Sequence, residues 1–323
     1  MKILVTGSGG LIGQSLTEAL LADGHVVVAA YRTSPPALAA SDRLRTVRLD
    51  LSRPVRGLEP VDVVIHAAAH THLIPGSTAW DYVRSNVLGT LHLMEYARAV
   101  RPKAVICFST MSVYGEVAVE ELDEETALNR PELYGASKYL AELIAREAGG
   151  TFPALCVRLP GVVGRGYFTP WIGTLLRAAI RQEPLRIYNP DALFNNIVDL
   201  QEIRRFIAHL IGRGVRGCEL VNLAASEPMR IREVAALIRS LTGSRAEIIV
   251  VDRAVKRSFV IRTARLRERL GFVPSTTQEI LQRYVAAHAP AGPERPEGVV
   301  PRAEPEAARR AAALHPSADR SAT

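Results

Sequence analysis

The sequence predicts an α/β fold, a doubly wound parallel sheet with a smaller C-terminal lobe. Segment 2–13 (KILVTGSGGLIG) reads as a buried strand, a glycine-rich turn and the start of a helix. Strand-like and helix-like segments then alternate along the chain, as in a parallel sheet covered by helices on both faces. A length of 323 residues also suffices for one large core and a second, smaller one.

The first turn carries the spacing T-G-x-x-G-x-x-G, with Gly7, Gly10 and Gly13 as its glycines. Such a turn needs a residue free to take positive φ, and a bound pyrophosphate needs backbone amides without an intervening Cβ. The following helix, expected at 14–22, offers unpaired N–H groups and a partial positive charge to phosphates. The motif therefore predicts a dinucleotide site, and the alternative is an ordinary tight turn.

The expected second strand, 25–31, ends at Arg32. In dinucleotide-binding sheets an acid at this position binds the 2′-hydroxyl of NAD, whereas an arginine accommodates the 2′-phosphate of NADP. Arg32 therefore favours NADP, with NAD possible and a solvated strand end as the alternative. The expected third strand, 46–51, brings Asp50 and Leu51 to the position from which an acid can reach the adenine amino group.

The expected fourth strand, 61–69, runs into three small residues that let the backbone approach a flat ring system: Ala67, Ala68 and Ala69. The histidines at 66, 70 and 72 suggest a metal site. No carboxylate or cysteine completes one in the sequence, so we expect no metal.

A helix is expected at 79–100, carrying Asn86, followed by a fifth strand at 104–109. Parallel sheets bind ligands at the carboxyl ends of their strands. The segment 109–112 (STMS) lies at such an end, and we expect a polar site there.

The helix that opens with YGASK places Tyr134 and Lys138 on one face, because their spacing is i, i+4. A free tyrosine has a pKa of about 10 and is a poor base at neutral pH. An ammonium group about 4 Å away stabilises a tyrosinate by roughly 4 kcal/mol at an effective dielectric near 20, which lowers the pKa. The pair is therefore expected to exchange a proton with a substrate hydroxyl, and a packed tyrosine beside a surface lysine is the alternative.

Composition excludes several classes of protein. No apolar run approaches the roughly 20 residues of a membrane span, and a strand begins too early for a signal peptide, so a cytoplasmic protein is expected. The net charge of +7 is spread over mixed-sign segments, which argues against nucleic acid and membrane partners. Cys107, Cys156 and Cys218 lack metal-ligand spacing and indicate a reducing compartment.

Taken together, the motifs resemble the extended short-chain dehydrogenase/reductase family, whose members include nucleotide-sugar epimerases, dehydratases and 4-keto reductases. The resemblance covers residues 1 to about 288 and implies a Rossmann fold. Its motifs are TGSGGLIG at 6–13, HAAA at 66–69, Asn86, FSTMSVYG at 108–115, YGASK at 134–138 and RLPGVVG at 158–164.

The resemblance implies that Thr110 is the catalytic hydroxyl residue, Tyr134 the general acid/base and Lys138 the residue that binds the ribose hydroxyls. The 4,6-dehydratase branch carries Asp-Glu after the threonine. This chain has Met111 and Ser112 there, which argues against dehydration.

The resemblance also implies which residues bind the cofactor and which bind the substrate. The expected cofactor-binding residues are Gly7, Gly10, Leu11, Ile12, Gly13, Arg32, Asp50, Leu51, Ala67, Ala68, Ala69, Asn86, Tyr134, Lys138 and Pro160. The expected substrate-binding residues are His70, Thr110, Met111, Ser112, Gly161 and Arg253.

Two positions depart from the nucleotide-sugar pattern. Gly161 replaces an asparagine that often contacts the substrate diphosphate, and Ala192 replaces an arginine. Three other arginines are candidates to supply positive charge, with solvated surface residues as the alternative: Arg177, Arg186 and Arg253.

We expect a dinucleotide-binding domain at 1–165, a substrate-binding lobe at 166–288 with some segments returning to the sheet, and a disordered tail at 289–323. The lobe contains expected helices at 168–182 and 230–242. The tail is rich in Ala, Pro, Arg and Glu and has too little apolar surface to offset its ordering entropy.

The activity expected from these features is reduction of a keto group on a nucleotide sugar by NADP(H). A nucleotide-sugar epimerase using NAD is the first alternative, since it needs the same Thr110, Tyr134 and Lys138. A non-catalytic NADP-sensing protein is an alternative of another class. The family resemblance also implies a homodimer formed through the helices that carry Asn86 and Tyr134.

Overall fold

The computed structural model describes residues 1–167, 171–252 and 258–288. The expected tail at 289–323, the start of the helix expected at 168–182 and the substrate-binding candidate Arg253 therefore lie outside the described residues.

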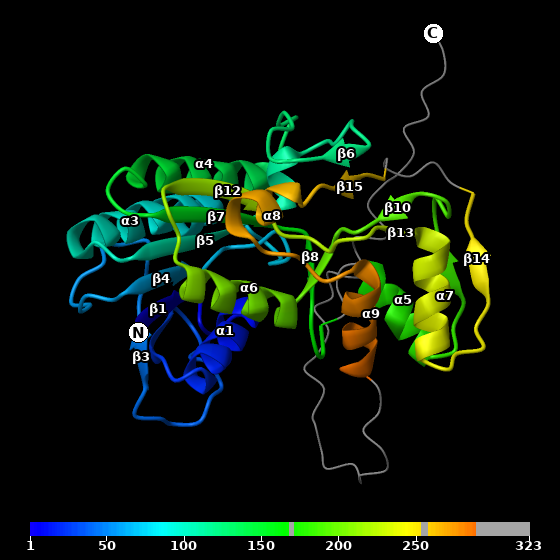
Figure 1. The fold of residues 1–323 in the computed structure, drawn as a ribbon, viewed down its shortest axis with the longest axis horizontal. Coiled ribbons are helices and arrows are strands. Elements are labelled where there is room, and N and C mark those ends of the chain that lie inside the picture. The colour runs from blue at the N-terminus through cyan, green and yellow to red at the C-terminus, as the bar shows by residue number, and fades with distance from the viewer. Residues whose placement is uncertain (168–170, 253–257, 289–323) are drawn as a thin grey trace.

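A seven-stranded parallel sheet forms the centre of the larger part of the molecule (Figure 1), which confirms the predicted α/β class. Its strand order is β12-β7-β5-β4-β1-β2-β3. The strands are β1 (Lys2–Thr6), β2 (Val26–Tyr31), β3 (Leu44–Arg48), β4 (Val63–His66), β5 (Ala104–Thr110), β7 (Ala154–Leu159) and β12 (Cys218–Asn222).

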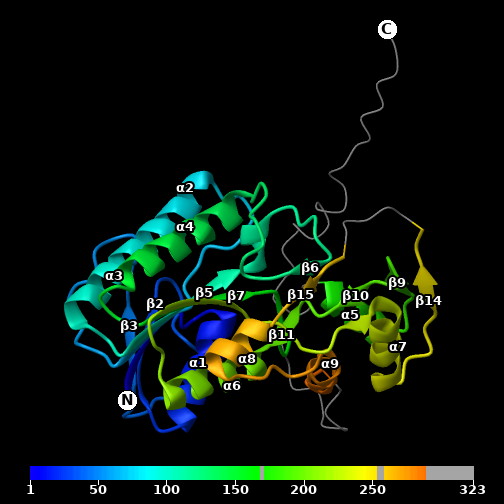
Figure 2. The ribbon, with the colours of Figure 1, turned by 45° about the horizontal axis from the view of Figure 1, so that its top comes forward.

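Helices cover both faces of this sheet (Figure 2). Ile3 and Val5 of β1 lie in a core shared with α1 and α6, whereas Leu4 points to the opposite core, which includes α3 and α4. Successive side chains of a strand alternate between faces, so each strand needs apolar residues at every position. The helices are α1 (Leu11–Ala22), α6 (Leu200–Arg213) and α8 (Ala264–Leu270) on one face, with α2 (Ala79–Tyr82), η1 (Val83–Leu88), α3 (Gly89–Val100) and α4 (Leu133–Ala148) on the other.

Two strands are shorter than the sequence indicates. β3 ends at Arg48, before Asp50, because its only partner β2 ends at Tyr31, the residue paired with Arg48. β4 ends at His66, the partner of Thr6 at the end of β1, so the following alanines leave the sheet. The residues that follow these two strands therefore lie at the carboxyl edge of the sheet, where parallel sheets bind their ligands.

The helix expected at 79–100 is three consecutive elements. α2 starts with a capping box in which Thr78 and Asp81 hydrogen-bond each other's backbone N–H groups. The π-helix η1 follows and contains the buried Asn86, and α3 completes the segment. Wide π turns are frequent at functional sites, and no residue pattern in the sequence indicated this one.

A second core lies in the smaller part of the molecule, at the right of Figure 1. It packs α5, α7 and α9 against short strands, and the two-residue strand β6 in the acidic segment 116–131 pairs with β15. The remaining elements of the described residues are η2 (Met111–Tyr114), β6 (Glu121–Leu122), β8 (Gly161–Val163), α5 (Trp171–Ile180), β9 (Leu185–Ile187), β10 (Leu193–Phe194), β11 (Ile197–Asp199), β13 (Met229–Arg230), α7 (Ile231–Leu241), β14 (Ile248–Val250), β15 (Val260–Ile261) and α9 (Thr277–Ala286).

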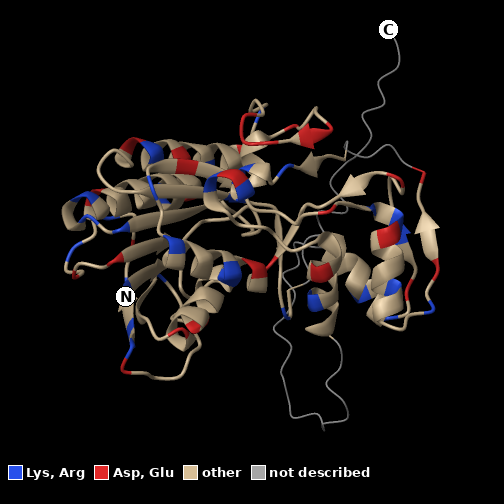
Figure 3. Cartoon of the chain, viewed as in Figure 1, with Lys and Arg blue, Asp and Glu red and all other residues tan. Residues whose placement is uncertain are grey.

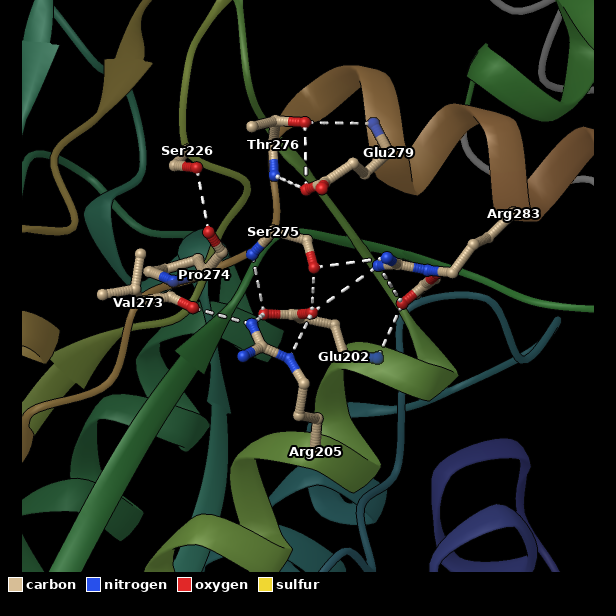
Figure 4. A network of polar contacts seen from close by, with 10 residues as sticks. Glu202, Arg205, Ser226, Val273, Pro274, Ser275, Thr276, Glu279 and Arg283 are labelled. Atoms are coloured by element: carbon tan, nitrogen blue, oxygen red, sulfur yellow. Dashed lines mark hydrogen bonds and ion pairs between the residues drawn. The ribbon is translucent and has the colours of Figure 1, made fainter.

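A buried carboxylate, Glu202, connects the start of α6 to the segment that leads into α9 (Figure 4). It accepts hydrogen bonds from the backbone N–H and hydroxyl of Ser275 at 3.0 and 2.7 Å. It also pairs with Arg205 and Arg283, and only 1% of its side chain is exposed. This network holds the second core against the helices of the main sheet.

Charged residues of both signs are interspersed along the described ribbon (Figure 3). Within residues 1–167, 171–252 and 258–288, none of the helices is long and apolar enough to cross a membrane.

Candidate functional site

The glycine turn after β1 is packed so tightly that side chains are excluded from it. Gly7 has φ +68°, and a Cβ there would lie 2.7 Å from the backbone of Ala68. A Cβ at Gly13 would lie 2.1 Å from the carbonyl oxygen of Gly7, and one at Gly9 would lie 2.0 Å from that of Ser34. Gly9 was not predicted as a site residue, because its neighbour Ser34 approaches only in the folded chain.

A cavity of about 320 Å³ opens beside this turn. It unites the predicted Gly7, Gly10, Arg32, Asp50, Leu51, Ala67, Ala68 and Ala69. Five of its polar or small lining residues carried no sequence signal of their own: Gly9, Thr33, Ser34, Ser52 and Ser85.

At the outer end of this cavity, Arg32 Nη1 donates a hydrogen bond to the hydroxyl of Ser85 at 3.1 Å. Asp50 accepts the backbone N–H of Ser52 at 3.0 Å. Burial raises the pKa of Asp50, but hydrogen bonds from Ser52 and the charges of Arg32 and Arg84 outweigh burial and leave the pKa below its ordinary value. This end of the cavity thus presents a guanidinium, an ionised carboxylate and hydroxyl groups.

A second cavity of about 370 Å³ continues from the same turn and shares Gly10, Ala67 and Ala69 with the first. It brings together the predicted Leu11, Ile12, Gly13, Thr110, Tyr134, Lys138, Pro160 and Gly161. Thr71, His72, Leu73 and Tyr167 also line it and were not predicted as site residues. The two cavities form one cleft along the carboxyl edge of the sheet.

Tyr134 lies beside the end of β5, and the side chain of Thr110 is near enough to act on its pKa. Its ring lies 5.2 Å from that of His72 and 6.2 Å from that of Tyr82, centroid to centroid. The pKa of Tyr134 is raised, chiefly by burial, and the hydrogen bond from Thr110 only partly opposes this effect. The expected lowering by Lys138 is therefore wrong for this structure, because burial disfavours the phenolate more strongly than the surroundings stabilise it.

Lys138 is buried on the same face of α4, with 4% of its surface exposed. Burial lowers its pKa, while Cys107, Glu142 and Cys156 act in the opposite direction. The tyrosine hydroxyl and the buried amine thus reach one cleft, where a reacting oxygen can contact Thr110 and Tyr134 together.

Asn86 and His70 lie behind the cavity wall, and neither lines the two cavities of the cleft. Asn86 exchanges two hydrogen bonds with the backbone of His70, at 2.7 and 3.0 Å, and donates to Ser137 at 2.9 Å. The side chain of His70 contacts Ser77 at 2.7 Å. Both residues therefore hold the segment after β4 against η1 and α4.

Met111 and Ser112 form the start of η2, and Ser112 donates its backbone N–H to Thr110 Oγ1 at 3.2 Å. Neither residue lines the two cavities. The turn they form orients the threonine hydroxyl.

The histidines after β4 do not form a metal centre in the described part of the chain, which contains no cluster of three or more suitable ligands. His66 hydrogen-bonds Thr6 at 2.8 Å and Thr90 at 3.1 Å. Burial, followed by the charge of Lys138, lowers its pKa to about 3, so His66 is neutral.

A third cavity, of about 310 Å³, lies between Gly161 and the second core. Its walls include Trp171 and Phe194, whose rings meet edge to face at 5.1 Å, and Asn196, whose buried Oδ1 has no hydrogen-bond partner. Arg177 and Arg186 are absent from the linings of these three cavities.

The sequence profile of the NAD dependent epimerase/dehydratase family matches residues 3–208, more than half of the chain. The chain belongs to this family. The predicted membership of the extended short-chain dehydrogenase/reductases is thereby confirmed, and the protein is an enzyme of that family.

Curated relatives of this family member share about a quarter of its residues. The UDP-glucose 4-epimerase of Streptomyces lividans is 28% identical over 308 residues, which cover 85% of this chain and 92% of the relative. The 2-alkyl-3-oxoalkanoate reductase of Stenotrophomonas maltophilia is 28% identical over 292 residues, covering 84% and 83%. Both comparisons extend into the second core.

Among solved structures, MoeE5 in complex with UDP-glucuronic acid and NAD is 27% identical, with a TM-score of 0.71. The match covers 89% of this chain and 99% of MoeE5. The predicted Rossmann fold of the parallel sheet is therefore confirmed.

Proposed function

We propose that this enzyme is an NAD(P)-dependent nucleotide-sugar epimerase that transfers hydride away from a secondary alcohol carbon and returns it to the other face. The observation that carries the proposal is the single cleft in which Thr110, Tyr134 and Lys138 meet the glycine turn. The UDP-glucose 4-epimerases among the relatives favour an epimerase over the reductase that the sequence alone suggested.

The cradle around the glycine turn fits a dinucleotide. Backbone atoms occupy the positions a Cβ would need at Gly7 and Gly13, so amides can approach a pyrophosphate closely. The N-terminus of α1 lies at the same place and attracts negative charge. When bound, the nicotinamide ring supplies the hydride acceptor and donor.

The chain's own residues then handle the proton. The hydroxyl of Thr110 hydrogen-bonds the reacting oxygen and orients it toward Tyr134, with which Thr110 is already in contact. Tyr134 must be a phenolate to accept the proton of that oxygen as the alcohol becomes a ketone, and it returns the proton when the ketone is reduced. The positive charges of Lys138 and of the oxidised nicotinamide, when bound, would favour this phenolate against the effect of burial. Lys138, which is buried on the same helix, would bind the ribose hydroxyls of the cofactor.

Epimerisation is tested with the purified protein, UDP-glucose and UDP-galactose, separated by chromatography. Tyr134→Phe is expected to reduce the rate about 10²- to 10⁴-fold, the usual contribution of a general acid/base. Tyr139→Phe is the matched control, since Tyr139 lies on the same helix but outside the cleft. Wild-type protein that interconverts neither sugar would refute the proposed substrate.

The cofactor is the finer part of the proposal. Arg32 at the cavity wall supports NADP, whereas solved relatives contain NAD. The ultraviolet spectrum and mass of the copurified nucleotide, followed by titration with NADH and NADPH, decide between them. If Arg32 binds a 2′-phosphate, Arg32→Ala weakens NADPH binding by about tenfold to a hundredfold, the value of a charge-assisted hydrogen bond, and leaves NADH unchanged.

A keto-group reductase is the second candidate, favoured by Arg32 and by the 2-alkyl-3-oxoalkanoate reductase among the relatives. Stoichiometric consumption of NADPH by a keto substrate, without a tightly held nucleotide, would favour it over the epimerase. A sensing role of another class requires that Tyr134→Phe leave cellular function unchanged.

We further propose that residues 166–288 supply most of the substrate-binding lobe, with the third cavity taking the nucleotide end of the substrate. A cytoplasmic homodimer completes the proposal. Three free cysteines support a reducing compartment, and exposed Val83, Leu133 and Leu140 on η1 and α4 support an apolar contact between copies. Light scattering of the full chain measures the oligomeric state.

A further inference from the structure

A buried carboxylate lies directly behind the catalytic groups. Glu142 follows Lys138 by one turn on the buried face of α4, and only 7% of its side chain is exposed. Lys138, Glu142 and Ser109 line one small cavity of about 10 Å³ between α4 and the sheet (helix and strands in Figure 1).

Glu142 ties three elements together. Its Oε1 accepts hydrogen bonds from the hydroxyl of Ser109 at 2.5 Å and from Arg158 Nε at 3.0 Å, and its Oε2 accepts Arg158 Nη2 at 2.7 Å. Ser109 and Arg158 are paired residues of the neighbouring strands β5 and β7. Because Ser109 directly precedes Thr110, the carboxylate fixes the strand end that presents the catalytic hydroxyl.

Glu142 is also a carboxylate that lies beside Lys138 and can act as its counter-ion. The ionisable groups that face this lysine are few. They are His66 from β4, Cys107 from β5, Cys156 from β7, and Tyr134 and Glu142 from α4 itself. His66 is neutral, and α3 contributes the uncharged Thr90, so Glu142 supplies the carboxylate charge of this group. A buried ammonium without a neighbouring negative charge gives up its proton readily.

We propose that Glu142 is a positioning residue of this enzyme, which holds Thr110 against Tyr134 through Ser109 and keeps Lys138 in its ammonium form. This proposal depends on the proposed function only for the predicted change in kcat. The charge and contacts of Glu142 act on Lys138 whatever the substrate is.

The test compares Glu142→Gln with Glu202→Gln. Both are buried glutamates that pair with arginine and accept a serine hydroxyl, but Glu202 lies in the network between α6 and α9 (Figure 4). Glu202→Gln therefore controls for the general cost of neutralising a buried, paired carboxylate. With UDP-glucose, Glu142→Gln is expected to lower kcat by about 10- to 100-fold with little change in KM, as loss of positioning does. Glu202→Gln is expected to lower stability without shifting the titration of Lys138.

A second measurement needs no turnover: the titration of Lys138 is monitored by NMR of protein that carries ¹³C- and ¹⁵N-labelled lysine. The Lys138 signal is assigned by its loss in Lys138→Arg. The expected result is a titration midpoint shifted to lower pH in Glu142→Gln and unchanged in Glu202→Gln. The high-pH decline of kcat moves to lower pH in parallel. If the wild type did not act on UDP-sugars but Glu142→Gln still shifted the Lys138 midpoint, the proposed function would be refuted and the role of Glu142 would stand.

An unchanged Lys138 midpoint together with an unchanged pH profile in Glu142→Gln would overturn the proposal and leave Glu142 a purely structural partner of Arg158. Should Glu142→Gln fail to fold because Arg158 loses its partner, the double variant Glu142→Gln/Arg158→Met is compared with Arg158→Met alone, so that loss of the carboxylate is measured apart from loss of the guanidinium. Ser109→Ala separates the two roles: it is expected to lower kcat while leaving the Lys138 titration in place.

Discussion

The packing of the glycine turn leads to a sharp prediction for Gly13→Ala. The new Cβ would lie 2.1 Å from the carbonyl oxygen, 2.7 Å from the carbonyl carbon of Gly7 and 2.9 Å from Ser8 Cα. All three atoms belong to the backbone, so no side chain can rotate away. Ordinary contacts begin at 3.4 Å, and the start of α1 would therefore have to move away from β1 by roughly 1 Å.

Overpacking of this kind typically costs about 1 to 3 kcal/mol, and we expect the upper end because backbone meets backbone. For a chain of this size, with an unfolding entropy of about 2.1 cal/mol/K per residue, 3 kcal/mol corresponds to a fall in Tm of about 4 to 5 °C. The same displacement moves the amides that would bind a pyrophosphate, so the affinity for NADH is expected to fall at least about tenfold.

The assay is thermal unfolding together with NADH fluorescence titration. Gly10→Ala is the matched control, since its Cβ would approach Gly7 O to only 3.3 Å, and its Tm is expected to stay within about 1 °C of the wild type. A Gly13→Ala protein with the Tm and NADH affinity of the wild type would refute the reasoning that close approach of α1 requires glycine there.

Three further outcomes follow from burial in the structure. Burial and Lys138 lower the pKa of His66 to about 3. In the unfolded chain His66 takes up a proton below about pH 6.5, whereas in the folded chain it stays neutral. The free energy of unfolding is therefore expected to fall by about 2 kcal/mol between pH 6.5 and pH 5. Urea unfolding at both pH values should show a shallower loss in His66→Gln, and an identical loss would contradict the assignment. Gly212→Ala in α6 adds a Cβ to open space and should raise stability by about 0.5 to 1 kcal/mol; a lower Tm would count against it. Phe206→Ala should cost about 3 to 5 kcal/mol, because this fully buried ring packs at 4.9 Å on Phe272, and a loss under about 1 kcal/mol in urea unfolding would contradict that packing.

Local patterns carried much of the fold and part of the candidate site. A short apolar strand, the T-G-x-x-G-x-x-G turn and a helix determine their own geometry within a dozen residues, so the parallel sheet was predictable. The Tyr134–Lys138 spacing likewise depends only on the helical repeat, and both side chains do reach one cleft.

Other features depend on contacts between distant parts of the chain. The lengths of β3 and β4 follow from where their partner strands end, and the π-helix that buries Asn86 left no recognisable residue pattern. The pKa of Tyr134 was expected to fall but rises, since burial is a property of the surrounding fold rather than of the Y-x-x-x-K spacing.

The sequence by itself determined the first five strands of the main sheet, the glycine turn and the helix that carries Tyr134 and Lys138, because each depends on neighbours within a few turns of chain. Only the tertiary structure decided which side chains meet across the sheet. Gly9 against Ser34, and Glu142 between Ser109 and Arg158, are brought together by parallel strand pairing and helix packing. Burial and electrostatics act over such through-space contacts, and sequence separation does not measure them.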